Sequence, residues 1–109
     1  MLDENARAEL ISGVVSLMRG SIASIILYGS TARGTDSAGS DVDIALITRG
    51  EVSDTMRSQL LDLSVDLDLA HDRIFSLICV DEAKFAQWRD VIPFYMNVSR
   101  EGIVLWSAA

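Results

Sequence analysis

Residues 27–47, LYGSTARGTDSAGSDVDIALI, contain the features that decide the fold of this chain. Apolar, β-branched runs lie on both sides of a segment of glycine, serine and other small residues. Such a segment does not favour a long helix or strand. We therefore predict a buried strand at 22–28 and a second strand at 41–47. Between them we expect a short helical turn at 30–33, closed by Gly34 in a left-handed conformation.

The rest of the chain alternates between helical and extended patterns. Apolar residues recur at three- and four-residue spacing in 3–19 and 52–71, which predicts two amphipathic helices. Strand, cap and turn signals predict four further elements: a strand at 74–80, a helix opened by Asp81, a helix from Pro93 to Arg100 ended by Gly102, and an edge strand at 103–106. This order predicts an α/β (α+β) fold, a small mixed β-sheet covered by helices.

Composition limits the classes of protein to consider. The chain has 109 residues, half of them hydrophobic and one of them proline, which predicts a single folded domain over 1–109. A formal net charge of −7 argues against a broad surface for nucleic-acid backbones. Cys79 has no partner cysteine, so it is expected to be a small core residue. The acidic start and the lack of a long apolar run predict no membrane span and a cytoplasmic location.

Asp41 and Asp43 stand two residues apart at the start of the second predicted strand. Both carboxylates should therefore project from one face of the sheet, about 6–7 Å apart along the chain. Two such charges repel each other, but they suit Mg²⁺, which is usually held by one or two carboxylates together with substrate phosphates. Alone they could be solvated charges on an edge strand; the neighbouring glycine–serine segment favours the metal site.

Gly29 and Ser30 follow the first predicted strand directly and begin the helical turn. Backbone N–H groups and the serine hydroxyl can face a phosphate at such a position, and glycine lets the phosphate approach the main chain without a Cβ between them. A metal on Asp41 and Asp43 could then touch a triphosphate resting on this segment, as in-line phosphoryl or nucleotidyl transfer requires.

Gly29-Ser30, ten intervening residues and Asp41-Val42-Asp43 resemble the GS-x10-DxD signature of the DNA polymerase beta-like nucleotidyltransferase superfamily. The resemblance is concentrated in residues 25–48. The length and the closing segment 99–103 look like the stand-alone minimal nucleotidyltransferases (MNT), which are often the antitoxin half of a pair with an all-helical HEPN-domain toxin.

This resemblance implies a palm fold and a Mg²⁺-dependent transfer of a nucleoside monophosphate from a triphosphate, with ATP expected, to a hydroxyl on a partner protein. Asp41 and Asp43 would be catalytic and hold the metal. Gly29, Ser30 and Arg33 would bind the nucleotide. The implied partners are the nucleoside triphosphate and a HEPN-type helical protein, and homo-oligomerisation stays open.

The resemblance fails at the third carboxylate, which in active members lies on the strand after the long helix. The aligned residue is Ser76, whose neutral hydroxyl is a poor substitute for an ionised ligand. Asp72 is the nearest stand-in, and Asp66 is a more remote one. The alternative function is therefore a catalytically impaired antitoxin of the same fold that acts by protein–protein binding.

Other conspicuous residues favour structural roles. Arg33 either touches a phosphate or forms an ion pair with Asp36 or Asp41. His71 stands near a helix C-terminus, where a cation is favoured, and is excluded from the site. The remaining groups are the acidic row Asp62, Asp66 and Asp68, expected on a solvated helix face, and the core or partner-surface candidates Trp88, Phe94, Tyr95, Met96 and Trp106.

Overall fold

The computed structural model describes residues 2–35 and 41–108, in which every predicted element is present. The elements in chain order are α1 (Glu4–Met18), β1 (Ile22–Tyr28), α2 (Gly29–Arg33), β2 (Val42–Thr48), α3 (Asp54–His71), β3 (Phe75–Asp81), α4 (Glu82–Trp88), α5 (Pro93–Glu101) and β4 (Ile103–Ser107). The strands predicted at 41–47 and 74–80 each begin and end one residue later than expected.

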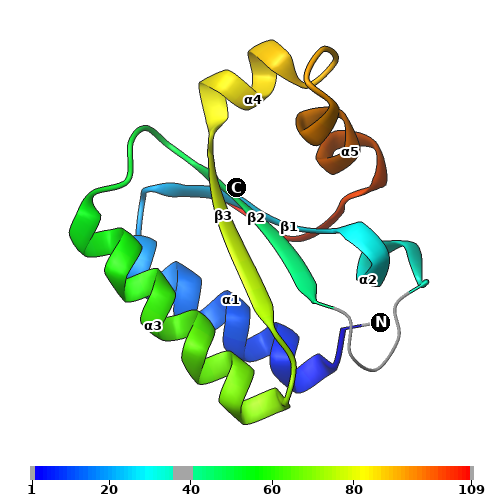
Figure 1. Cartoon of the computed structure of the whole chain (residues 1–109). Helices are drawn as coiled ribbons and strands as arrows, with labels where there is room; N and C mark the ends of the chain where they lie inside the picture. Colours follow the sequence, from blue (N-terminus) through cyan, green and yellow to red (C-terminus); the bar gives the residue numbers. More distant parts are fainter. Residues whose placement is uncertain (1, 36–40, 109) are drawn as a thin grey trace.

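The four strands form one mixed sheet in the order β3-β2-β1-β4. β1 lies antiparallel to both of its neighbours, whereas β2 and β3 are parallel. A parallel pair needs a long crossover connection, and α3 supplies it (Figure 1). The predicted mixed sheet covered by helices is confirmed, and β4 lies at an edge as expected.

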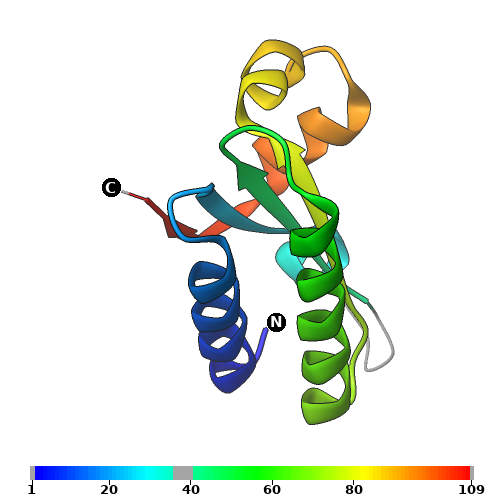
Figure 2. The ribbon, with the colours of Figure 1, turned by 90° about the vertical axis from the view of Figure 1, so that its left-hand side faces the viewer.

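Helices cover the two faces of this sheet unequally. α1 and α3 lie side by side across one face, here called the α1/α3 face, and α4 and α5 lie over the other, the α4/α5 face (Figure 1, Figure 2). The larger core fills the α1/α3 face and includes Leu10, Val14, Ile25, Ile44 and Leu46. The smaller cluster fills the α4/α5 face and includes Ala23, Ile26, Ala45, Ile47, Val80 and Val98.

Local signals explain where the helices begin and end. The side chains of Asp3, Ser53 and Asp81 accept hydrogen bonds from backbone N–H groups in the first turns of α1, α3 and α4. These bonds satisfy donors that have no partner within the helix. Gly102 ends α5 and donates its N–H to the Val98 carbonyl at 3.1 Å.

Some side-chain predictions are wrong or incomplete. Trp88, a core candidate, is 39% exposed, because α4 has only seven residues and buries none of them fully. Cys79 is half-buried on β3 and packs against the larger core. Asp68, expected to be solvated, is half-buried and accepts a hydrogen bond from the Phe75 N–H at 2.7 Å. His71 contacts Glu9 on α1, with 2.7 Å between Nε2 and Oε2.

No helix in the described part of the chain combines the length and the apolar character needed to cross a bilayer.

Candidate functional site

The strands bring three side chains together where β1 ends and β2 begins. Tyr28 at the end of β1 pairs with Asp43 on β2, and Asp43 pairs with Ser76 on β3. Since neighbours in register point to the same face of a sheet, all three side chains lie on the α4/α5 face. Asp41 precedes β2 and, two residues from Asp43, belongs to the same face.

Gly29 lies directly against one of the carboxylates. Its φ of +77° is a left-handed conformation that L side chains rarely adopt, and a Cβ placed there would lie 2.5 Å from Asp43 Oδ2. The backbone at the start of α2 therefore borders the Asp43 carboxylate with no side chain between them. The predicted glycine–serine segment and the predicted acid pair are thus neighbours in space.

Burial and neighbouring charges shift the pKa values of two groups at this end of the sheet. Partial burial raises the pKa of Asp43, the charge of Asp41 raises it further, and Arg33 opposes the shift. The pKa of Tyr28 is also raised, first by burial and then by the charge of Asp43. Both shifts show that an extra negative charge at this end of the sheet is disfavoured and that a bound cation would be favoured.

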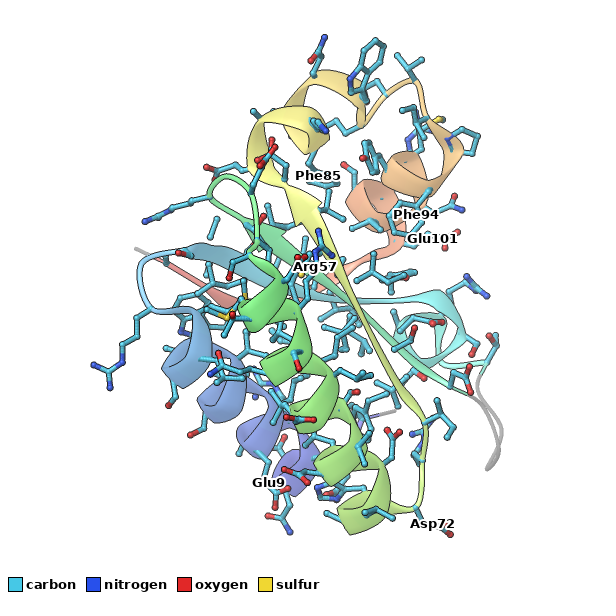
Figure 3. All side chains as sticks on the ribbon, turned by 60° about the vertical axis from the view of Figure 1, so that its left-hand side comes forward. Glu9, Arg57, Asp72, Phe85, Phe94 and Glu101 are labelled. Atoms are coloured by element: carbon cyan, nitrogen blue, oxygen red, sulfur yellow. The ribbon has the colours of Figure 1, made fainter. Side chains whose placement is uncertain are left out.

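The aromatic ring of Tyr28 also contacts α5. Tyr28 and Phe94 meet edge to face with 5.5 Å between ring centroids. Figure 3 shows Phe85 and Phe94 projecting from α4 and α5 toward the sheet. These contacts fix the α5 side of the site, and sequence reasoning missed them because Tyr28 was counted only as a strand residue.

Polar contacts tie α2 to the start of β2. Thr31 is buried, and its Oγ1 donates to the Asp41 carbonyl and accepts from Arg73 Nη2, both at the long distance of 3.4 Å. Gly34 closes α2 in the left-handed conformation, at φ +74°, as predicted. Thr31 and Arg73 thus help to position Asp41. Arg73 has no motif spacing or periodicity that would have identified it in the sequence.

Arg33 forms an ion pair, but with a partner that was not expected. Its Nη1 donates to Glu101 Oε2 on α5 at 3.0 Å, rather than pairing with Asp41. Asp36, the other expected partner, lies outside the described residues. Both side chains of the observed pair are close to half exposed, so it contributes little to stability.

Ser76, which the resemblance aligns with the third carboxylate, pairs directly with Asp43. Asp72 caps α3 and points away from the sheet at the turn before β3 (Figure 3). Asp66 lines a groove with Gly13 and Leu17 between α1 and α3. Neither stand-in joins the pair: residues 2–35 and 41–108 contain no cluster of three or more His, Cys, Asp or Glu side chains suited to a metal.

Comparison with known proteins shows the family of the chain. The family model described as "Polymerase beta, Nucleotidyltransferase" matches residues 15–109. The chain belongs to this family. A Methanocaldococcus jannaschii protein, provisionally named a protein adenylyltransferase, is 34% identical over 109 residues, covering 97% of this chain and 100% of the relative. The chain is therefore a nucleotidyltransferase by family, and enzymes of this class generally use a nucleoside triphosphate and a divalent metal ion.

Solved structures share the fold at low identity. A chain of a toxin–antitoxin crystallised with AMP-PNP has a TM-score of 0.64 and 21% identity, covering 94% of this chain and 73% of that one. A chain from the complex of a tri-AMPylated Shewanella oneidensis HEPN toxin with an MNT antitoxin has a TM-score of 0.63 and 18% identity, covering 98% and 74%. These similarities establish the nucleotidyltransferase fold.

Proposed function

We propose that residues 1–109 act as one Mg²⁺-dependent nucleotidyltransferase domain that transfers the AMP group of ATP to a hydroxyl on a partner protein. The observation that carries this proposal is the pair Asp41 and Asp43 beside the side-chain-free backbone of Gly29, in a chain of the nucleotidyltransferase family. The catalytic and metal-binding residues would be Asp41 and Asp43.

The donor set fits one Mg²⁺. Two carboxylates share one face of the sheet, and the charge of Asp41 together with partial burial raises the pKa of Asp43, so a cation would relieve both costs. Carboxylate oxygens are ligands that Mg²⁺ prefers. When bound by Asp41 and Asp43, the ion would supply positive charge against the phosphate oxygens and the charge that develops during transfer.

The nucleotide would be held by the first turn of α2. Gly29 has no Cβ to keep a phosphate from the main chain, and Ser30 would offer its hydroxyl and its N–H group. Arg33 is half exposed beside the site. It would reach a phosphate by giving up its ion pair with Glu101. The reaction forms an O–P bond between the acceptor hydroxyl and the α-phosphorus, and pyrophosphate leaves.

We propose that the acceptor is a HEPN-type toxin and that the chain acts as its antitoxin in the cytoplasm. The M. jannaschii relative is provisionally named a protein adenylyltransferase. One structure of the same fold comes from a complex in which an MNT antitoxin accompanies a tri-AMPylated HEPN toxin. Both support a protein acceptor.

A second candidate function is binding without transfer. Ser76, a neutral residue, lies beside Asp43 where a third carboxylate would complete the acid set. If this loss abolishes transfer, the chain would neutralise its partner by forming a complex.

Transfer of label to a HEPN-type partner protein distinguishes the two functions. The purified proteins are mixed with Mg²⁺ and ATP labelled at the α-phosphate, in parallel with ATP labelled at the γ-phosphate. We expect covalent label from the α-phosphate alone, and none with Asp43→Asn. A stable complex without label would support the second function, and label from the γ-phosphate would contradict nucleotidyl transfer.

A further inference from the structure

We propose that the outer face of α3 docks a cationic amphipathic helix of another protein. The inner face of α3 is anchored in the fold, because Leu60 and Leu67 are buried in the core shared with α1 and β3. The outer face presents Leu61, Val65 and Leu69, which are 64%, 46% and 81% exposed. These three residues are called the α3 stripe.

The α3 stripe is a continuous apolar row. Its members stand at i, i+4 and i+8, so they line up along the helix over about 12 Å. In a helix that covers a core, the side that faces solvent is normally polar. In Figure 3 the outer face of α3 is turned toward the viewer, and no other drawn element lies over it. The stripe therefore adds a second apolar row to a helix that already has a buried one.

Carboxylates border the α3 stripe on both sides. Adjacent helical residues lie about 100° apart, so Asp62 and Asp66, which each follow a stripe residue, border one side, and Asp68, which precedes Leu69, borders the other. Asp68 accepts the Phe75 N–H with one oxygen. Arg57, one turn before Leu61, is the cation at the N-terminal end of the row.

This charge pattern selects the occupant. Two copies of the chain packed through α3 would bring three carboxylates against three, and like charges across an interface oppose association. A helix with an apolar row flanked by lysine or arginine complements both features of the stripe. Rows at i, i+4 spacing pack into the groove between such rows on another helix, which favours a helical partner over an extended one.

The α3 stripe and the candidate site belong to elements on different faces of the sheet. α3 covers the α1/α3 face, whereas Tyr28, Asp43 and Ser76 belong to the α4/α5 face (Figure 2). At the β3 edge the two surfaces come close, because Leu61 lines one groove with Ser76 and Ile78. The peptide test needs neither nucleotide nor acceptor protein, so docking and nucleotidyl transfer can each fail without the other.

The test uses three labelled peptides and the full chain, with binding followed by fluorescence anisotropy. The first peptide is helical, with leucine at i, i+4 and i+8 flanked by lysine; the second has the same composition with the leucine row scrambled; the third has glutamate for lysine. We expect the first to bind, more weakly as salt rises, and the other two to bind at least about tenfold more weakly.

Variants locate the binding to the α3 stripe. Leu61→Ser combined with Leu69→Ser should weaken binding of the first peptide at least about tenfold, because the apolar row is lost. Val104→Ser removes a side chain that is 57% exposed on β4 and should leave the affinity within about twofold. Both variants alter exposed residues, and a thermal melt verifies their folding.

Three results would overturn the proposal. The scrambled peptide could bind as tightly as the first, which would mean that net charge alone explains the binding. The double variant could bind the first peptide no more weakly than the Val104→Ser control. Sedimentation could show a parent dimer that the double variant converts to a monomer, which would make a second copy the occupant.

Discussion

The α1/α3 face and the α4/α5 face are built from the same strands, yet the helices cover them to different extents. Val42 and Ile44 are fully buried beneath α1 and α3, whereas Asp43 between them is only partly buried on the other face. On β3, Ile78 on the α4/α5 face is 39% exposed. The α1/α3 face, here the closed face, therefore supplies most of the hydrophobic stabilisation. The α4/α5 face, here the half-open face, keeps charged groups within reach of a ligand.

The largest expected effect is on the rate of transfer and comes from a substitution on the half-open face that should leave stability intact. Asp43→Asn should reduce transfer by about 10³-fold, because the site loses a charged oxygen ligand. The midpoint of thermal unfolding should not fall, since the substitution also removes a partly desolvated charge. Initial rates of label transfer and a thermal melt measure the two. A large loss of stability with little loss of rate would make Asp43 a structural residue.

On the closed face the same strand should respond in the opposite way. Leu46→Ala removes a fully buried side chain and should lower the free energy of unfolding by about 2–5 kcal/mol. Ile78→Ala on the half-open face is the matched control and should cost less than about 1.5 kcal/mol. Urea unfolding compares them. Equal losses would show that both faces are closed in solution.

Two glycines with nearly equal φ angles isolate the contact with Asp43. Gly34→Ala adds a Cβ at φ +74° with no other atom within 4 Å, so backbone strain of about 1–2 kcal/mol is its main cost. Gly29→Ala at φ +77° also places a side chain at positive φ, and in addition it displaces the Asp43 carboxylate. We expect Gly29→Ala alone to impair nucleotide binding severely. Equal binding by the two variants would rule out a phosphate position at Gly29.

Ser76→Asp tests whether the half-open face lacks a ligand. Ser76 pairs with Asp43, so an aspartate there would place a third carboxylate in the site and should raise transfer. Without metal, three like charges should lower the melting temperature, and Mg²⁺ should raise it more than in the parent chain. Ser76→Asn, which adds similar bulk without charge, is the control. No gain in rate or in Mg²⁺-dependent stability would mean that the parent site is complete with two acids.

The smallest effect concerns pH. The pKa of Asp43 is raised in the folded state, so the folded chain holds this proton more tightly than the unfolded chain, and ionised Asp43 costs stability above its folded pKa. Asp43→Asn should therefore be slightly more stable than the parent at neutral pH. That advantage should shrink as the pH falls through the raised pKa and disappear below the ordinary value of 3.8. Paired urea titrations at several pH values measure the difference, and a constant difference would contradict the shift.

Local patterns in the sequence predicted much of the fold. Strand 22–28, the N-cap Asp81 and the helix that begins at Pro93 all follow from short-range signals. Ser76, which the family resemblance aligned with the third carboxylate, pairs with Asp43.

Long-range pairs and uncovered surfaces were beyond that reasoning. Arg33 pairs with a residue 68 positions away, and Arg73 with one 42 positions away, and neither pair leaves a local pattern. The apolar row of α3 that faces the core was predicted, whereas the α3 stripe was not, because periodicity shows that a row exists and not what covers it.

The central claim is that Asp41 and Asp43 hold a metal–nucleotide complex at Gly29. Isothermal titration calorimetry with Mg²⁺ and a non-hydrolysable α,β-methylene analogue of ATP tests it most directly, because no acceptor is needed. Asp90→Asn, an exposed acid between α4 and α5, provides the matched change in net charge. The account predicts binding by the parent and by Asp90→Asn, and binding at least about tenfold weaker by Asp43→Asn. Equal affinity of Asp43→Asn and the parent would contradict it.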